Sequence, residues 1–253
     1  MLKHRVIPAL LLHRDGLVKT RKFADPTYVG DPLNAIRIFN EKEVDELLVV
    51  DMTATREGRE PNFELIASFA TECFMPLGYG GGISKLEHAE RLFRLGVEKV
   101  SVQTATRSGL ELVTQIAERY GSQAVVGSVD VKTDWKGSHQ LYWSADKSMG
   151  GDLRGHLDRL TSAGVGEILL NATDRDGMMG GMDLKLIKTI TDGLRVPLIA
   201  LGGVGQLQHI REAVDAGASA VAAGSFFVFH GKHRAVLITY PAYNVLENLL
   251  STR

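Results

Sequence analysis

Two stretches of sequence decide the fold: Pro76-Leu-Gly-Tyr-Gly-Gly-Gly-Ile83 and Pro197-Leu-Ile-Ala-Leu-Gly-Gly-Val204. They match at a constant offset of 121 residues. The same offset relates four further pairs: Gly96 and Gly217, Val100 and Val221, Thr104 and Ser225, Glu46 and Glu167. Near the start of each half the offset slips to 119, where Val6-Ile7 overlays Val125-Val126. Such self-similarity indicates a duplicated unit, so we predict two similar halves, roughly residues 1–121 and 122–253.

Short apolar runs alternate with segments of helical period along the chain. We expect eight buried strands, at 5–12, 46–51, 76–79, 99–103, 124–131, 167–171, 197–201 and 220–223. We expect eight helices, at 32–42, 62–72, 85–95, 110–120, 153–163, 184–191, 206–216 and 242–251. Continuous apolar strands are typical of a parallel sheet that is covered on both faces. Eight strand–helix units in a chain of 253 residues, without a proline- or serine-rich linker, predict a single α/β domain, a (β/α)₈ TIM barrel over residues 1–253.

Composition excludes several classes of protein. Lys and Arg total 29 against 30 Asp and Glu, so the chain lacks the basic excess that a nucleic-acid binder normally carries. A lone cysteine, Cys73, cannot form an internal disulfide and is most simply a packing residue. No apolar run reaches the roughly 18–20 residues of a membrane helix, and the first residues do not read as a signal peptide. We therefore expect a cytoplasmic protein with no membrane or nucleic-acid partner.

Each half carries a glycine pair at the end of a strand, followed by a helix. Glycine allows the backbone to approach an anion closely, and free N–H groups at a turn or helix start can bind it. Each pair has a hydroxyl-bearing companion after the next strand. The predicted phosphate contacts are Gly82 and Thr104 in the first half and Gly203, Gly224 and Ser225 in the second. The alternative is that these glycines only turn the chain. Two phosphate-binding sites would suit an extended ligand with a phosphate near each end.

Polar residues also follow the carboxyl ends of strands two, five and six, the end at which barrel active sites lie. They are Asp51, Asp130, Asn171 and Asp176. Asp130 interrupts an apolar run, where a carboxylate needs a partner or a chemical role, and Lys19 and Lys132 could supply positive charge. A plain structural acceptor is the alternative for Asp130 and Asp51. The glycine- and methionine-rich segment 174–182 suits a mobile lid, although a flexible connector would look similar.

Four charged residues, Arg5, Glu46, Lys99 and Glu167, fall at the amino ends of predicted strands, opposite the active-site face. If all four point inward, two cations and two anions form a ring across the barrel floor. Such a ring satisfies its own charges and leaves a constriction for a small neutral molecule. Four solvated residues at strand starts are the alternative.

Seven segments together resemble the cyclase subunit of imidazole glycerol phosphate synthase, from the first strand to the last helix. They are Arg5-Val-Ile-Pro8, Gly80-Gly-Gly-Ile83, Lys99-Val-Ser-Val-Gln-Thr-Ala105, Gly121-Ser-Gln-Ala-Val-Val126, Gly166-Glu-Ile-Leu-Leu170, Asp174-Arg-Asp-Gly177 and Leu201-Gly-Gly203. The resemblance implies a barrel that binds a bisphosphorylated ribonucleotide and receives ammonia from a glutaminase subunit docked at its floor. It implies that the four floor residues form the ammonia gate, and it adds Gly177 to the phosphate contacts. No metal or other cofactor is expected, because the eight histidines lie singly.

One departure from that family concerns the chemistry. The family uses two aspartates as acid and base, at the ends of strands one and five; Asp130 matches the second, but Leu11 stands where the first belongs. The 119-residue offset also places Leu11 opposite Asp130, and leucine cannot transfer a proton. Gln103 and Leu201 replace the family's usual Asn and Ser near the phosphates.

The pattern therefore resembles diverged paralogues associated with surface-polysaccharide (O-antigen) gene sets, in which ammonia is thought to serve a sugar amidotransferase. Two alternatives remain open: an active cyclase of histidine biosynthesis, and the sister isomerase that acts on a phosphoribosyl aminoimidazole carboxamide ribonucleotide. The isomerase would need paired carboxylates and no floor gate.

Trp135 and Trp143 flank a polar insertion after strand five, where a small hairpin is expected.

Overall fold

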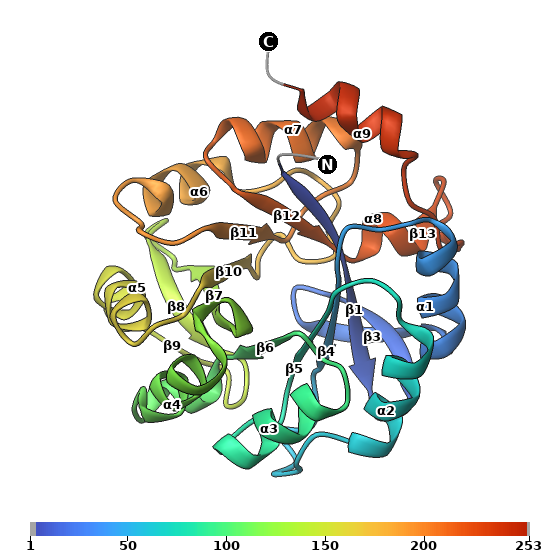
Figure 1. Cartoon of the computed structure of the whole chain (residues 1–253). Helices are drawn as coiled ribbons and strands as arrows, with labels where there is room; N and C mark the ends of the chain where they lie inside the picture. The colour runs from blue at the N-terminus through green and yellow to red at the C-terminus, as the bar shows by residue number, and fades with distance from the viewer. Residues whose placement is uncertain (1–3, 252–253) are drawn as a thin grey trace.

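The computed structural model describes residues 4–251, and its centre is a closed parallel β-barrel (Figure 1). Eight strands build it: β1 (Arg5–His13), β4 (Leu47–Asp51), β5 (Leu77–Gly80), β6 (Lys99–Val102), β7 (Val125–Thr133), β10 (Glu167–Ala172), β11 (Leu198–Leu201) and β12 (Ala220–Ala223). Each strand pairs in parallel with the next, and β12 returns to β1 with Arg5 opposite Ala220, which closes the cylinder. The predicted (β/α)₈ TIM barrel is confirmed. Residues 1–3 and 252–253 of the expected domain lie outside the described residues.

Helices surround the barrel, and short helical turns lie at strand ends (Figure 1). The long helices are α1 (Pro32–Glu41), α2 (Phe63–Glu72), α3 (Leu86–Arg94), α4 (Glu111–Tyr120), α5 (Leu153–Ser162), α6 (Leu184–Thr191), α7 (Leu207–Asp215) and α9 (Tyr243–Leu250). The short ones are η1 (Thr104–Arg107), η2 (Ser122–Ala124) and α8 (Ser225–Val228). All eight predicted helices exist, with ends shifted by no more than one residue.

Helix α1 illustrates how sequence sets these elements. The Asp31 carboxylate accepts a hydrogen bond from Asn34 N at 2.9 Å, which caps the helix, and Pro32 fits its first turn because that position needs no N–H donor. Ala35, Ile36 and Phe39 recur at helical spacing and are fully buried. Burying a side chain such as Phe39 stabilises the fold by roughly 1.5–3 kcal/mol, so the apolar stripe fixes which face of the helix meets the sheet.

Two separate apolar layers result. The larger lies between the sheet and the helices, and the smaller fills the barrel itself. The inner layer includes Ile7, Leu48, Val126, Leu169 and Ile199. Side chains alternate along each strand, so every barrel strand contributes to both layers.

The duplicated halves remain visible in the backbone. Gly81 and Gly82 have φ of +108° and +72°, and their counterparts Gly202 and Gly203 have +102° and +103°. These values lie in the left-handed region that favours glycine, so the turn after the strand is built in the same way twice.

Three antiparallel hairpins extend this plan. They are β2–β3 (Gly16–Arg21 and Ala24–Gly30), β8–β9 (His139–Trp143 and Ser148–Met149) and β13–β14 (Phe229–His230 and Ala235–Val236). The hairpin after strand five was expected and is confirmed by β7 pairing with β8. The β2–β3 and β13–β14 hairpins were not predicted. The turn of β2–β3 places Lys22 and Phe23 at φ of +51° and +64°, without the Asn-Gly or Asp-Gly pair that normally indicates such a turn.

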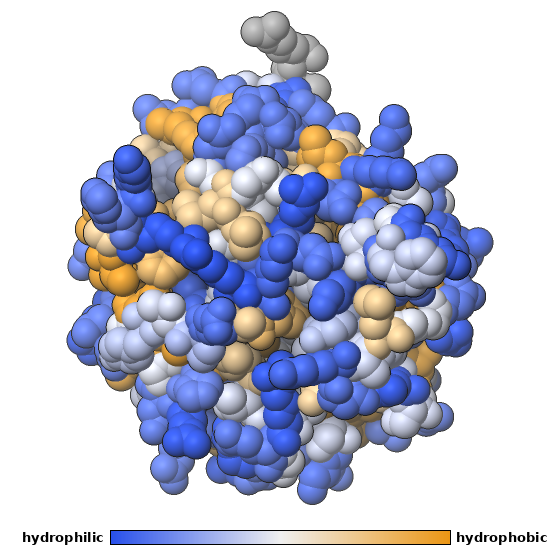
Figure 2. All heavy atoms as spheres, turned by 180° about the vertical axis from the view of Figure 1, so that it is seen from behind, coloured by the Kyte–Doolittle hydropathy of each residue, from blue (hydrophilic) through white to orange (hydrophobic). Residues whose placement is uncertain are grey.

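No helix within residues 4–251 is long and apolar enough to cross a membrane. Seen from behind, hydrophilic side chains cover most of the surface, and apolar ones gather in patches between them (Figure 2). Trp135 is 89% exposed, and Phe74 is 87% exposed.

Candidate functional site

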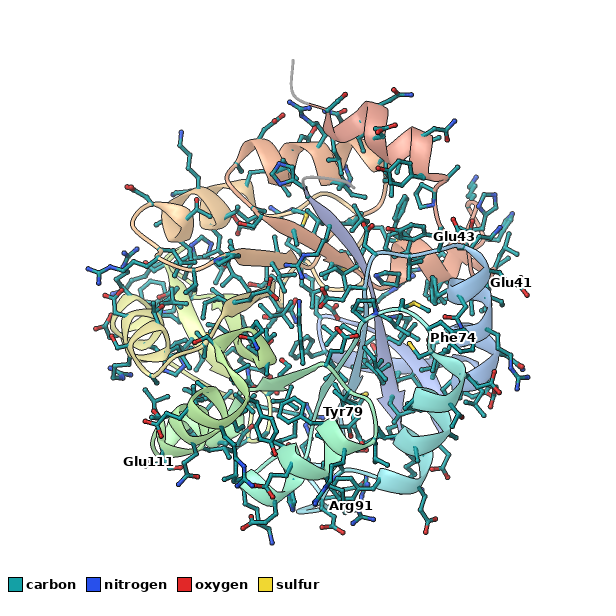
Figure 3. All side chains as sticks on the ribbon, in the orientation of Figure 1. Glu41, Glu43, Phe74, Tyr79, Arg91 and Glu111 are labelled. Atoms are coloured by element: carbon teal, nitrogen blue, oxygen red, sulfur yellow. The ribbon has the colours of Figure 1, made fainter. Side chains whose placement is uncertain are left out.

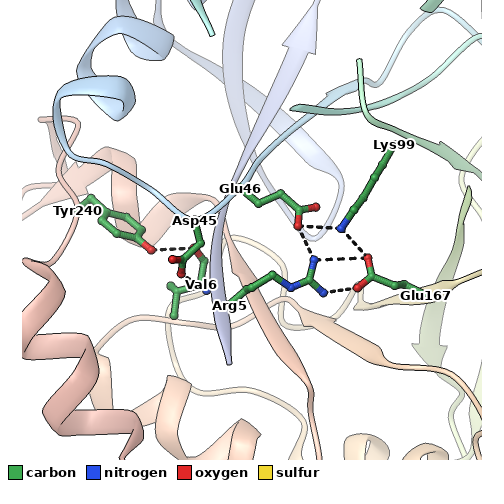
Figure 4. Close-up of polar contacts among 7 residues, drawn as sticks. All are labelled: Arg5, Val6, Asp45, Glu46, Lys99, Glu167 and Tyr240. Carbon is green, nitrogen blue, oxygen red and sulfur yellow. Dashed lines mark hydrogen bonds and ion pairs between the residues drawn. The ribbon is translucent and has the colours of Figure 1, made fainter. Parts of the chain in front are cut away.

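Four charged side chains meet at the floor of the barrel (Figure 4). The Arg5 guanidinium donates hydrogen bonds to Glu46 and Glu167. Lys99 Nζ lies 2.9 Å from a carboxylate oxygen of Glu46 and 2.9 Å from one of Glu167. Each cation bridges both anions, so the side chains point toward one another across the floor instead of outward into solvent. The arrangement is a closed ring of two positive and two negative charges, which we call the floor ring.

Neighbouring groups fix the start of β1 and with it the floor ring. Val6 N donates to the Asp45 carboxylate at 3.2 Å, and Tyr240 Oη donates to Val6 O at 2.8 Å (Figure 4). Burial raises the pKa of Asp45 and of Tyr240. Burial works to lower the pKa of Arg5, but the charges of Glu46 and Glu167 and the hydrogen bonds to them outweigh it, so this pKa rises. Arg5 therefore stays charged.

A small void lies directly above the floor ring. It has a volume of about 10 Å³ and is lined mostly by apolar groups of the inner layer, together with Glu46, Lys99 and Ser101. A volume of this order holds roughly one water-sized molecule. Ser101 and Leu169 line both this void and the large cavity above it, so the two spaces are separated by single side chains.

A cavity of about 1270 Å³ occupies the opposite, carboxyl end of the barrel. Most of the residues predicted for the site line it: Leu11, Lys19, Asp51, Gly82, Thr104, Asp130, Asn171, Asp176, Gly224 and Ser225. Two predicted phosphate contacts, Gly177 and Gly203, are not among the residues that line it. The floor ring and the cavity thus occupy opposite ends of one cylinder.

Asp130 is buried at the base of the cavity within a polar network. Gln103 Nε2 donates to one of its oxygens at 2.7 Å, and Asn171 Nδ2 donates to the other at 3.3 Å. Burial raises the pKa of Asp130 to about 7, although these hydrogen bonds favour the charged form. A carboxyl group with such a pKa can accept or release a proton near neutral pH. Lys132, expected as a possible partner, is exposed and makes no ion pair with Asp130 in the described part of the chain.

Lys19 reaches from the β2–β3 hairpin into the large cavity at the carboxyl end of the barrel, which we call the mouth. Its amine donates to Ala9 O, and burial lowers its pKa to about 8, against the attraction of Asp176. Asp176 also accepts a hydrogen bond from Thr20 Oγ1 at 3.0 Å. Lys19 is therefore a cation held near the ligand space by a hairpin that was not predicted from the sequence.

Asp51 has a structural role in this geometry. One of its oxygens accepts from Thr53 N at 2.8 Å, Thr53 Oγ1 at 2.8 Å and Ala54 N at 2.9 Å. These bonds fix the turn after β4; Asp51 also lines the large cavity, so its predicted contact with a ligand stays a prediction. Its second oxygen lies 3.9 Å from the Arg59 guanidinium.

The loop after β10 packs against the second glycine pair, and the predicted phosphate contacts of Gly177 and Gly203 stay predictions. A Cβ atom on Gly177 would overlap Thr20 O, and one on Gly203 would overlap Gly181 O. Gly181 N also donates to Gly203 O at 2.9 Å. The sequence could not reveal this, because the contacts join loops far apart along the chain.

Sequence reasoning missed several residues at the mouth. Ser144 Oγ donates to Gln103 Oε1 at 3.1 Å and so extends the network around Asp130. Phe23 and Lys85 also line the cavity. Ser144 belongs to the insertion after strand five, for which only a hairpin was expected. Among residues 4–251, no cluster of His, Cys, Asp and Glu is arranged to hold a metal ion.

Comparison with known proteins gives consistent matches along almost the whole chain. Residues 5–234 match the family described as Histidine biosynthesis protein. A protein of Pseudomonas aeruginosa, provisionally named imidazole glycerol phosphate synthase subunit hisF2, is 53% identical over 98% of this chain and 99% of its own. One of Vibrio vulnificus, provisionally named subunit hisF3 of the same enzyme, is 46% identical over 96% of this chain and 94% of its own. The imidazole glycerol phosphate synthase subunit HisF of Streptococcus sanguinis is 38% identical over 89% of this chain and 91% of its own.

Proposed function

The chain belongs to the histidine biosynthesis family, among its imidazole glycerol phosphate synthase cyclase subunits, and we propose that it has diverged toward delivering ammonia while losing most of its ring-closing activity. In this proposal a glutaminase subunit docks at the barrel floor and releases ammonia there. The ammonia passes the floor ring and the small void and reaches the large cavity, where a phosphorylated ligand binds. The observation that carries the proposal is an intact floor ring beneath a mouth in which Leu11 occupies the position of an acid–base aspartate.

The lining above the floor ring supports passage of neutral ammonia. Ile7, Leu48, Val126 and Ile199 surround the void, and moving an ion through such surroundings costs several kcal/mol more than moving a neutral molecule. In the closed arrangement Lys99 bridges two carboxylates. A swing of Lys99 would open a gap while Arg5 still held both glutamates, so we propose Lys99 as the moving part of the gate.

Docking of a partner at this end is supported by exposed side chains. Phe74 follows α2 and precedes β5, so it lies at the amino ends of the strands, on the side of the floor ring. Glu41 ends α1 and Glu43 follows it before β4, and both lie in the same sector as Phe74 (Figure 3). Aromatic side chains are enriched at protein interfaces, and the rim around them is polar.

Loss of the ring-closing step is supported by the surroundings of Asp130. Its neighbours Gln103 and Asn171 are amides, and Leu11 and Leu201 line the cavity where the family carries Asp and Ser. A single carboxyl group then has to serve as both acid and base. A positioned acid–base group typically contributes roughly 10²–10⁴-fold to the rate.

The most detailed part of the proposal is the identity of the molecule that finally accepts the nitrogen. We propose a sugar on a separate amidotransferase, because the resemblance is to paralogues associated with such enzymes. The main alternative is a working cyclase of histidine biosynthesis, and the retained Asp130 favours it. The sister isomerase is disfavoured, because it needs paired carboxylates and would not need the floor ring.

One experiment tests both the loss of ring closure and the passage of ammonia through the floor ring. The complex with the co-purifying glutaminase is supplied with the bisphosphorylated ribonucleotide of the family's cyclases, and imidazole formation is followed with either ammonium or glutamine as nitrogen source. With ammonium, we expect Leu11→Asp to raise turnover by at least about 100-fold over the unmodified chain. In the Leu11→Asp background, Lys99→Met should reduce glutamine-driven turnover and leave ammonium-driven turnover unchanged. Lys132→Met, at the other end of the barrel, is the control.

Two outcomes would contradict the proposal. Turnover of the unmodified chain equal to that of Leu11→Asp would show that ring closure was never lost. An equal effect of Lys99→Met on both nitrogen sources would show that the floor ring is not a passage for ammonia.

A further inference from the structure

The turn between β8 and β9 lies against the base of the mouth. Ser144 and Ala145, at this turn, line the large cavity. Ser144 Oγ donates to Gln103 Oε1 at 3.1 Å, and Gln103 Nε2 donates to the carbonyl oxygen of Tyr142 at 3.3 Å. The side-chain amide of Gln103 is therefore held at both of its ends by the β8–β9 hairpin.

The same amide donates to Asp130. Gln103 Nε2 lies 2.7 Å from Asp130 Oδ2. A carbonyl oxygen accepts hydrogen bonds and cannot donate them, so the contact with Tyr142 O requires the nitrogen of the amide to point this way. If the amide were turned over, its oxygen would face the carboxyl group and repel its charged form. The hairpin thus decides which end of the Gln103 amide Asp130 meets.

The position of the turn above the barrel depends on contacts from outside the hairpin. Within the turn, Asp146 Oδ1 accepts hydrogen bonds from Ser148 N at 3.0 Å and from Ser148 Oγ at 2.7 Å. These bonds fix the shape of the turn but not its distance from Gln103. Lys147 has a φ of +60°, a conformation that a lysine rarely adopts. A turn with such a residue keeps its place only if other parts of the chain hold it there.

Two arginines from other parts of the barrel supply these contacts. Arg56, in the loop between β4 and α2, donates from Nε to Ser144 O at 3.0 Å. Arg107, at the end of η1, forms an ion pair with Asp146 at 2.5 Å. The Arg107 guanidinium also lies over the ring of Trp143, 5.4 Å from its centroid. We call Arg56 and Arg107 the arginine clasp.

The segment that carries Arg107 also fixes the backbone of Gln103. Thr106 donates to Gln103 O from its backbone N at 2.9 Å and from Oγ1 at 2.6 Å. Hydrogen bonds from Ser148 and Arg107 hold the pKa of Asp146 well below its usual range. The Asp146 carboxylate therefore stays charged at neutral pH, and the ion pair with Arg107 persists there.

Other groups act on Asp130 directly. Besides burial, which raises its pKa to about 7, the largest influences come from neighbouring side chains: Gln103, Asn171 and Ser144, which lower this pKa, and Asp176, which raises it. Tyr142 lies opposite Asp130 in the sheet register, and burial raises the pKa of its hydroxyl. The charge of Lys19 acts on Asp176. Neither arginine of the clasp is among the largest influences, so the clasp can reach Asp130 only through the hairpin and Gln103.

We propose that Arg56 and Arg107 are positioning residues for Asp130, because they hold the β8–β9 turn where it keeps the Gln103 amide donating to this carboxyl group. Without the clasp, the turn moves away and releases the amide, and Asp130 loses the shorter of its two amide hydrogen bonds. The inference rests on the proposed function only in taking Asp130 as the group that exchanges a proton.

Nuclear magnetic resonance of the chain labelled with ¹³C at its aspartate carboxyl carbons tests the inference. Asp130→Asn identifies the resonance of Asp130, and its shift with pH gives the pKa. Exposed ion pairs are weak, so we expect the double variant Arg56→Met/Arg107→Met to raise this pKa by only about 0.5–1. Replacing both arginines by lysine keeps both charges and a donor at each position, and should recover part of the change.

Two further variants separate positioning from a direct effect of charge. Ser144→Ala removes one hydrogen bond to Gln103, leaves both arginines in place and should also raise the pKa of Asp130. In a Gln103→Leu background, the double methionine substitution should add less than about 0.2 to this pKa, because the clasp acts through Gln103. Arg119→Met is the matched control: it removes an exposed arginine that pairs with Glu90, and it should leave the titration unchanged.

Two results would overturn the inference. One is an unchanged pKa of Asp130 in the double methionine variant, with circular dichroism showing that the variant is folded. The other is an equal change with and without Gln103, which would mean that the arginines act by their charge alone. The titration needs neither substrate nor partner, so both results leave the proposed function to its own test with two nitrogen sources.

Discussion

Substituting Lys99 by methionine removes one of the two cations of the floor ring and keeps a side chain of similar length. The side chains of Glu46 and Glu167 are only 6% and 13% exposed, and each would retain Arg5 as a partner. Removing one partner of a fully buried ion pair costs roughly 3–5 kcal/mol, and an exposed pair contributes less than about 1 kcal/mol. Lys99 is 18% exposed, so we expect a loss of about 2 kcal/mol. For a chain of this length, that loss lowers Tm by about 4–8 °C.

Urea and thermal denaturation at pH 7, followed by circular dichroism, measure this loss. Adding Glu46→Gln to Lys99→Met removes the surplus negative charge, so the double variant should recover about half of the lost stability. Lys132→Met, at an exposed position, should stay within about 0.5 kcal/mol of the unmodified chain. A cost below about 0.5 kcal/mol for Lys99→Met, or simple addition of the two single losses in the double variant, would refute the reasoning that these charges act as one network.

Three further predictions concern other parts of the barrel. Burial raises the pKa of Asp130 from 3.8 to about 7, so the native state binds more protons than the unfolded state between about pH 4 and pH 7. The free energy of unfolding, measured by urea denaturation, should therefore fall as pH rises through that window. Asp130→Asn should flatten this pH profile. Tyr240→Phe removes the buried hydrogen bond to Val6 O and should cost about 1–2 kcal/mol, seen as a lower Tm; an unchanged Tm would contradict this. Gly177→Ala places a Cβ against the backbone of β2 at a φ of +69° and should cost about 1–3 kcal/mol by the same measurement, whereas Gly180→Ala, with open space around it, should cost much less.

The barrel could be predicted from sequence because its signals are local and repeated. Eight apolar runs, eight helical periods and a constant offset agree with one another, and burial follows directly from that pattern. The positions of Arg5, Glu46, Lys99 and Glu167 were predictable for a related reason: a residue at or just before the first position of a parallel barrel strand lies at the floor, whichever strand carries it.

The hairpin over the mouth could not be predicted in the same way. Its turn uses Lys22 and Phe23 at positive φ, so tertiary contacts stabilise a conformation that neither residue favours by itself. Lys22 N donates to Asp176 O at 3.0 Å across the mouth. No pattern within residues 16–30 encodes that partner.

The covering of Gly203 is a second example. The glycine pair has the same sequence signature in both halves, yet only the first pair is among the residues that line the cavity. A loop packs against the pair in both halves: a Cβ on Gly82 would lie 2.9 Å from Arg59 O, and one on Gly203 would overlap Gly181 O. A motif therefore predicts the backbone conformation better than it predicts what the backbone can reach.

Both halves send an antiparallel arm from their first strand over the mouth, and the two arms touch where Phe23 meets Tyr142 edge-on, with ring centroids 6.0 Å apart. An aromatic pair of this kind contributes about 0.5–1.5 kcal/mol, which is between one and three times the thermal energy at room temperature. This contact alone is therefore too weak to hold the two arms together against loop motion. The rate at which a small molecule enters would then be set by its diffusion to the cavity. Its residence time would depend on its contacts with the cavity walls and not on the opening of the arms.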